Sequence, residues 1–100
     1  MAIAILWVFT VRPDQAEAFE AAYGPRGSWA ALFGQSPGFL GTELWRDAAI
    51  GRYHTVDRWV SRSACEAFLA AKGEDYAALD RDCEALTETE ARLGTFDVLD

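Results

Sequence analysis

The sequence predicts an α+β domain in which four strands and two helical regions follow the order β-α-β-β-α-β. Three observations support this class. Short apolar runs rich in β-branched and aromatic residues alternate with segments of helical spacing, two of the runs are separated by a connection of hairpin length, and 100 residues is a common length for one domain. We therefore expect residues 1–100 to form a single domain with a four-stranded antiparallel sheet and its helices on one face.

The first strand is expected over residues 2–11, where β-branched and aromatic side chains dominate. Pro13 fixes its own φ and favours the start of a helix over residues 13–23, whose apolar side chains recur at helical spacing. The GPRG sequence at residues 24–27 then interrupts the helix, and Ser28 is placed to cap a second short helical turn. The first helical region is therefore predicted to be split.

Two further strands are expected over residues 39–46 and 52–60, each rich in aromatic and β-branched side chains. The five residues between them, 47–51, are enough for a hairpin connection, so these strands should pair antiparallel.

The second helical region should begin at Ser61-Arg62-Ser63, a segment that together with Glu66 resembles a capping box. Gly73 is predicted to stop this helix. A further helix is expected over residues 76–86, where apolar side chains recur on one face, and Gly94 should end the helical region. Residues 95–99 then form the last strand.

Side chains alternate along a strand, so parity assigns them to the two faces of the sheet. With the hairpin centred near Ala49, one face carries Phe39, Gly41, Glu43, Trp45, Tyr53, Thr55, Asp57 and Trp59. The other face carries Leu40, Thr42, Leu44, His54 and Val56. The first strand is apolar on both of its sides, so neither face of the sheet is predicted to be polar.

The helices of one chain can cover one face of this sheet, and leaving the other in water would expose a large apolar patch. We therefore expect a symmetric homodimer, because a second copy can bury that patch. The alternative is a monomer that tolerates it. The residues expected at the dimer interface are Leu6, Val8, Leu40, Leu44, His54 and Val56.

Charge and cysteine content exclude several classes of partner. The net charge is −7 and the basic residues are scattered among acidic ones, so neither nucleic acid nor a membrane is an expected partner. The apolar run at residues 2–9 is too short to span a bilayer and has no basic leader. Cys65 and Cys83 are separated and form no metal or disulfide pattern, which favours a cytoplasmic location without a bound metal.

Four stretches carry a resemblance to a known family, and together they span nearly the whole chain. They are FEAAYGPRGSWAALF, SPGFLGTELWRD, YHTVDRWVSRSACEAF and YAALDRDCEALTETEARLGTF. This pattern resembles the antibiotic biosynthesis monooxygenase family. The resemblance implies a ferredoxin-like fold of the dimeric α/β-barrel type.

The resemblance also implies an activity, which is oxidation of a small phenolic or quinol-type aromatic by O₂ without a cofactor. The reaction would occur in a pocket between the sheet and the helices, and Trp59 matches a family tryptophan that lines this pocket. Quinol oxygenases of the family use an Asn where Thr55 stands here, and this chain contains no Asn. Haem-degrading relatives use an Asn on the first strand, near Trp7, and a His on the helix after the third strand; residues 61–71 contain no His, so haem degradation is not expected.

Three residues are candidates for catalysis, each with a structural alternative. Asp57 could act as a base if burial raises its pKa, or could pair with Arg58, Arg62 or a helix terminus. Tyr53 could donate to an oxyanion or simply pack in the core. His54 is the only histidine, but its parity places it toward the predicted interface.

The aromatic side chains could form a slot for a planar ligand or could fill the core. The predicted substrate pocket comprises Trp7, Tyr23, Trp29, Trp45, Thr55, Trp59 and Phe68. Two functions remain open at this point. One is an oxygenase that acts on an aromatic substrate, and the other is a ligand-binding or accessory dimer of the same fold without catalysis. A cavity with Tyr53 or Asp57 exposed inside would favour the oxygenase.

Overall fold

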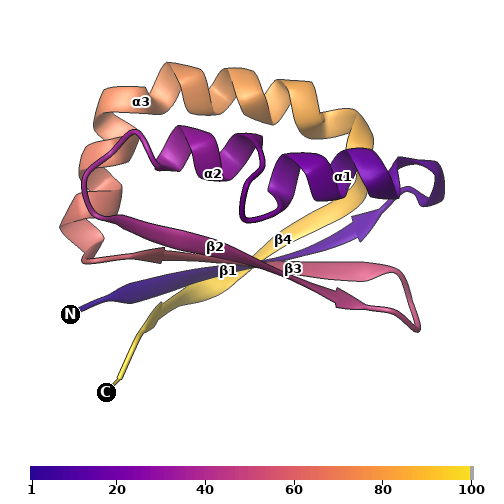
Figure 1. The fold of residues 1–100 in the computed structure, drawn as a ribbon, viewed down its shortest axis with the longest axis horizontal. Helices are drawn as coiled ribbons and strands as arrows, with labels where there is room; N and C mark the ends of the chain where they lie inside the picture. The colour runs from indigo at the N-terminus through magenta and orange to yellow at the C-terminus, as the bar shows by residue number, and fades with distance from the viewer. Residues whose placement is uncertain (100) are drawn as a thin grey trace.

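The computed structural model describes residues 1–99 and shows helices on one face of a single antiparallel sheet (Figure 1). The strands lie in the order β2-β3-β1-β4, so the ferredoxin-like α+β fold is confirmed. In chain order the elements are β1 (Ile3–Val11), η1 (Pro13–Gln15), α1 (Ala16–Tyr23), α2 (Ser28–Phe33), β2 (Phe39–Asp47), β3 (Arg52–Trp59), α3 (Arg62–Cys83), η2 (Glu84–Leu86) and β4 (Thr87–Asp97).

The second helical region differs from the prediction. Residues 62–83 form one helix, α3, and Gly73 does not stop it. Lys72 next to it has non-helical backbone angles (φ −122°, ψ 21°), so the helix is kinked where a break was expected. The hydroxyl of Ser61 accepts a hydrogen bond of 3.1 Å from the Ala64 backbone N–H and caps the helix as predicted.

The prediction for the last strand was wrong at its start. β4 begins at Thr87, eight residues before the expected position, and Gly94 lies inside it rather than at the end of a helix. Its side chains are largely polar and exposed because β4 is an edge strand, paired on one side with β1. A polar edge strand lacks the apolar alternation by which the other strands are recognised.

A bulge in β2 reverses the side-chain parity predicted for most of that strand. Phe39 pairs with Trp59, but the next paired residue is Gly41 with Arg58, so one extra residue is inserted. Gly41 has φ +140°, which a residue with a side chain rarely adopts. From Thr42 onward the faces are therefore exchanged: Leu44 pairs with Thr55 on the helix side, and Trp45 pairs with His54 on the outer side.

The core lies between the sheet and the helices and is mainly aromatic. Trp59, Phe19 and Phe68 are its most deeply buried large side chains, and Phe33 packs edge-on against Trp59 and Phe68 with ring centroids 5.8 and 5.2 Å apart. No helix in the part of the chain that the structure describes is long and apolar enough to cross a membrane.

The outer face of the sheet has no helix over it (Figure 1) and carries apolar side chains from all four strands. Leu6 pairs there with Val56, and Val8 with His54. On this face Trp45 is 49% exposed and Phe96 48%, and Leu40, the residue inserted at the bulge, is 57% exposed.

Candidate active site

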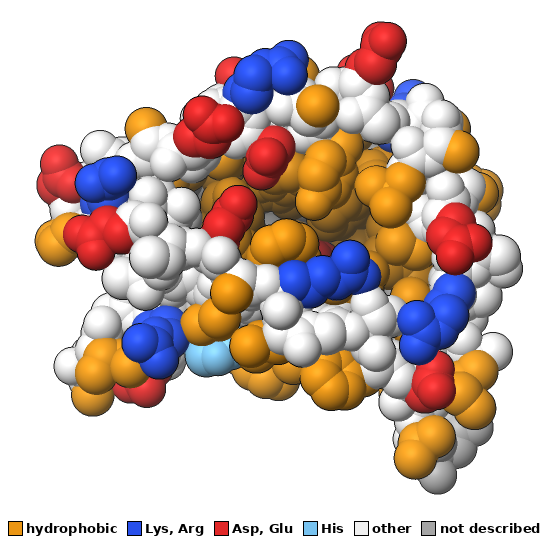
Figure 2. Space-filling view, turned by 180° about the vertical axis from the view of Figure 1, so that it is seen from behind, with side chains coloured by type: hydrophobic (Ala, Val, Ile, Leu, Met, Phe, Trp, Pro, Cys, Tyr) orange, Lys and Arg blue, Asp and Glu red, His pale blue; other side chains and the backbone are white. Residues whose placement is uncertain are grey.

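Two adjoining hollows lie between the sheet and the helices, and together they form the candidate site. The first, here called the aromatic pocket, has an empty volume of about 550 Å³, counting the solvent at its mouth. It is lined by Trp7, Phe9, Tyr23, Trp29, Phe33, Thr55, Asp57, Tyr76, Asp80 and Glu90. Figure 2 shows a hollow with hydrophobic walls and charged side chains around its rim.

The second hollow, here called the side pocket, shares four residues with the first, including Trp7 and Asp57. Trp59 and Phe68, both expected in the substrate pocket, line this side pocket rather than the aromatic pocket. Its remaining lining residues are Ile5, Cys65, Leu69 and Arg92.

Asp57 is the titratable group at the centre of this arrangement, since it lines both hollows and its residue is 9% exposed. It lies on β3, an interior strand, and parity turns it toward the helices. The neighbouring strand places Thr42 directly opposite, and the Thr42 hydroxyl donates a 2.6 Å hydrogen bond to Asp57 Oδ1.

Burial raises the pKa of Asp57 to about 6, and the hydrogen bond from Thr42 opposes part of that rise. The predicted alternative of an ion pair is wrong for both arginines. Arg58 pairs instead with Glu43 at 2.6 Å, and Arg62 with Asp97 at 3.6 Å. Asp57 is thus a buried carboxylate, without an ion-pair partner in residues 1–99, at the wall of an aromatic pocket.

Two tyrosines in the aromatic pocket keep their phenol protons at neutral pH. Burial raises the pKa of Tyr23, and the nearby Cys83 adds to this effect. Burial also raises the pKa of Tyr76, with further contributions from Asp80, Glu90 and Asp57. Each phenol therefore keeps a proton that it can donate in a hydrogen bond, and that of Tyr23 lies beside Cys83. Tyr23 and Trp29 were expected in the pocket, whereas Tyr76 was predicted only as part of a helix.

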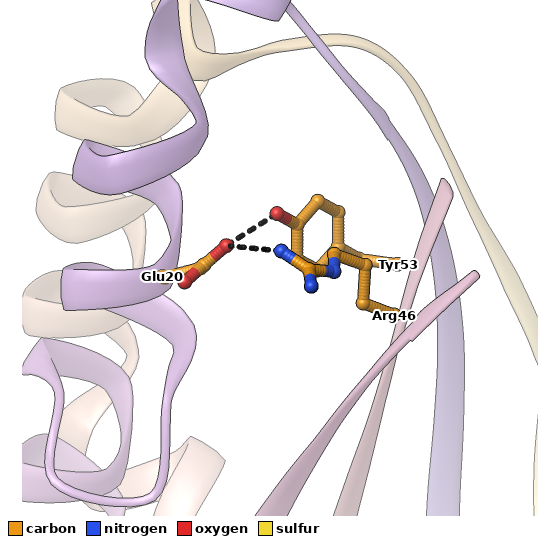
Figure 3. A network of polar contacts seen from close by, with 3 residues as sticks. All are labelled: Glu20, Arg46 and Tyr53. Atoms are coloured by element: carbon orange, nitrogen blue, oxygen red, sulfur yellow. Dashed lines mark hydrogen bonds and ion pairs between the residues drawn. The ribbon is translucent and has the colours of Figure 1, made fainter. Parts of the chain in front are cut away.

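Tyr53 lies outside the aromatic pocket, so its placement as a pocket residue was wrong. Its ring is buried against Phe19, with centroids 4.9 Å apart, and its hydroxyl donates a 2.5 Å hydrogen bond to Glu20 Oε2 on α1 (Figure 3). Arg46 Nη1 lies 3.8 Å from the same oxygen. The hydrogen bond to Glu20 is the largest cause of the raised pKa of Tyr53. This cluster connects the sheet to α1 at a distance from Asp57.

Replacing Tyr53 with phenylalanine should therefore affect stability and leave ligand binding unchanged. We expect the free energy of unfolding to fall by about 1–2 kcal/mol, because Glu20 loses its donor while the ring stays packed. Urea denaturation measures the stability and tryptophan fluorescence titration the binding. A weaker affinity of the variant for an aromatic ligand would instead show that Tyr53 takes part in ligand binding.

His54 and Trp45 both lie on the outer face of the sheet, where β2 and β3 pair them. Neither lines the aromatic or the side pocket. For Trp45 this corrects the prediction of a pocket residue, and the physical reason is the bulge at Gly41. The same shift turns Leu44 toward the core, which corrects its placement at the dimer interface.

Several pocket residues were not predicted from the sequence. Phe9 and Phe33 were assigned only to their elements, although their apolar periodicity could have indicated a buried position. Glu90 lies in a polar stretch that was interpreted as helix, and no pattern in the sequence predicted that its side chain would line a cavity. Within residues 1–99, no three His, Cys, Asp or Glu side chains are grouped as a metal centre would require.

Comparison with known proteins agrees with the fold described above. The family model described as antibiotic biosynthesis monooxygenase matches residues 2–78. No curated protein sequence is similar enough to count as a match. Among solved structures, a mutant form of SnoaB, a cofactor-independent oxygenase from Streptomyces nogalater, is similar with a TM-score of 0.79 and 26% identity, over 99% of this chain and 94% of that one.

Two further structures share the fold at lower identity. Rv0793 from Mycobacterium tuberculosis has a TM-score of 0.67 and 23% identity, over 100% of this chain and 97% of that chain. PA3566 from Pseudomonas aeruginosa has a TM-score of 0.68 and 20% identity, over 99% and 95% respectively.

Proposed function

The chain belongs to the antibiotic biosynthesis monooxygenase family, and from that premise we propose that it oxidises a small phenolic or quinol-type aromatic with O₂ and without a cofactor. The main support for this proposal is that Asp57 lies buried at the wall of an aromatic pocket, where its pKa is raised to about 6. A carboxylate with a pKa near the working pH is suited to act as a general base, because it is largely deprotonated and still basic enough to accept a proton from the substrate.

Asp57 would start the reaction by taking a proton from the bound substrate. Thr42 holds Oδ1 at 2.6 Å, which leaves Oδ2 for the substrate. The resulting anion is electron-rich enough to reduce O₂ directly. For an anthrone, the CH₂ group becomes a carbonyl: one oxygen atom of O₂ enters the product and the other leaves as water, with all four electrons supplied by the substrate. The tyrosine hydroxyls of the pocket would donate to the substrate oxygen during this step.

The experiment is O₂ uptake with a panel of dihydroxynaphthalenes and anthrones, measured with and without the protein. Protein-dependent consumption and a quinone product are expected for at least one compound. Anaerobic incubation is the matched control and should leave the substrate unchanged. No consumption across the panel would contradict the proposal.

A second function, ligand binding without catalysis, is favoured by two observations. The aromatic pocket carries Thr55 where quinol oxygenases of the family use an Asn, and the Tyr53 hydroxyl is bound to Glu20 outside it. Saturable quenching of tryptophan fluorescence by panel compounds, without O₂ uptake, would identify this second function.

We also propose that the working form is a homodimer joined through the outer face of the sheet, as is usual in this family. The outer face carries Leu6, Val8, His54 and Val56, with Trp45 in place of Leu44. Leu40, the residue inserted at the bulge, is 57% exposed and is included in the proposed interface. Figure 2 shows hydrophobic side chains gathered below the hollow as well as inside it. The two free cysteines are compatible with a reducing compartment such as the cytoplasm.

A further inference from the structure

The charge distribution of the aromatic pocket narrows the class of substrate. Three carboxylates, those of Asp57, Asp80 and Glu90, are among its lining residues, and no Lys, Arg or His side chain is. The three ion pairs formed within residues 1–99 involve none of these acids. The pocket therefore has a negative potential that the chain itself does not neutralise.

Asp80 and Glu90 line the aromatic pocket from opposite layers of the fold. Asp80 lies on α3, and Glu90 lies on β4, where it pairs with Phe9. Both residues also line a neighbouring hollow, which places their carboxylates near each other. Partial burial raises the pKa of Glu90, and Asp80 and Glu84 raise it further. A cation between Asp80 and Glu90 would offset their negative charges.

The nearest basic side chain on β4 does not supply this cation. Arg92 lines the side pocket, not the aromatic pocket, and its Nη2 donates a 2.5 Å hydrogen bond to Thr95 Oγ1 farther along the strand. The pocket thus has an acidic end near Asp80 and Glu90 and a basic group in the adjoining hollow.

The walls of the pocket suit a cationic aromatic molecule. Trp29 and Tyr76 meet edge to face with ring centroids 4.9 Å apart, and the pocket also contains Trp7, Phe9 and Phe33. Aromatic faces attract ammonium groups as well as planar rings. Trp29 is 6% exposed, and its side chain lies beside Tyr23 and Cys83, so the indole forms a fixed part of the pocket wall.

We propose that the aromatic pocket selects phenolic substrates that carry a protonated amine, with the ammonium group held between Asp80 and Glu90 and the phenol directed toward Asp57. This inference rests on the proposed function, because Asp57 is the base there, and it adds the substrate class. Asp57 becomes neutral when it takes the proton, and the amine offsets the negative potential of Asp80 and Glu90 that would otherwise oppose formation of the phenolate.

The test compares three phenols of similar size by isothermal titration calorimetry at pH 7.5. They are 4-(2-aminoethyl)phenol, the neutral 4-ethylphenol and the anionic 3-(4-hydroxyphenyl)propanoate. The amine is expected to bind about tenfold more tightly than the neutral compound, from its contacts with the two carboxylates and the aromatic walls, and the anion to bind most weakly. Equal affinity for the amine and the neutral phenol, or binding of none of the three, would overturn the inference.

Two variants show which residues are responsible. In Asp80→Asn/Glu90→Gln the advantage of the amine should fall below about twofold, since both counter-charges are removed. The matched control is Asp14→Asn/Glu17→Gln, which changes the net charge equally at exposed positions away from the pocket and should keep the advantage. If the first variant does not fold, the same comparison is made on the native protein at increasing salt concentration. Salt screens the two carboxylates, so the ratio of amine affinity to neutral-phenol affinity should fall in the same way. An advantage that survives these changes contradicts the assignment.

The outcome is separable from that of the proposed function. Oxidation of neutral phenols without preference for the amine would overturn this inference and leave the oxygenase proposal in place. Selective binding of the amine without O₂ uptake would support the inference and contradict the oxygenase.

Discussion

Asp57→Asn is expected to lower kcat/KM for O₂-dependent oxidation at pH 7 by about 10²- to 10⁴-fold, the range that a positioned general base contributes. Asparagine keeps the size of the side chain and can still accept the hydrogen bond from Thr42, so the pocket should retain its shape. Steady-state O₂ uptake with the best compound of the panel provides the measurement. Asp14→Asn, at an exposed position, is the matched control and should retain full activity.

Unfolding of the variant can be distinguished from loss of the base by measuring stability against pH. Because the pKa of Asp57 is raised when folded, the native state binds the proton more tightly than the unfolded state, and this contribution to stability is lost as the pH rises through about 6. At pH 8 the folded wild-type protein must keep the buried Asp57 carboxylate ionised, which lowers its free energy of unfolding. Asp57→Asn has no such charge. The variant should therefore gain up to about 2–3 kcal/mol relative to wild type between pH 4 and pH 8. An inactive variant that is also less stable at pH 8 would indicate a structural role.

Trp45→Glu is expected to convert the proposed homodimer to monomer, with a dissociation constant raised about 100-fold or more. A tryptophan at the centre of an interface commonly contributes about 2 kcal/mol or more, and a buried charge without a partner adds to the loss. Trp45 is 49% exposed in the single chain, so the substitution should not disturb the core. Sedimentation equilibrium gives the dissociation constant.

The control for this substitution adds the same charge to the other side of the molecule. Ala18→Glu lies at an exposed position of α1, in the helix layer, and should remain dimeric. Dissociation of both variants, or of neither, would show that the outer face of the sheet is not the interface.

The sequence was sufficient to predict β1, β2 and β3, because their apolar and aromatic residues form short runs bounded by proline and glycine. It was insufficient for β4, where Thr and Glu residues at the sheet edge need no apolar face and were interpreted as helix. Gly73 was interpreted as the end of a helix. In the structure the helix is only kinked at Lys72 and continues to Cys83, because Tyr76 and Leu79 on its second half pack against the core.

For the candidate site, parity along β3 placed Asp57 and Thr55 correctly on the helix side, since β3 has no irregularity between them. Parity failed for Trp45 and Leu44 because a single inserted residue at the bulge exchanges the two faces of a strand. For Tyr53, parity indicated the face but not the distance along the strand. Its hydroxyl contacts Glu20 on α1, a partner 33 positions away in the sequence that no pattern revealed.

The most direct test of the proposed chemistry is an NMR titration of the Asp57 side-chain carboxyl, followed through its ¹³C chemical shift in the native protein. The buried carboxylate at the pocket wall should titrate with a pKa near 6, and the resonance should be missing in Asp57→Asn. A titration midpoint of about 4, the ordinary pKa of aspartate, would show that the carboxyl is solvated and too weak a base, and would contradict the proposed chemistry.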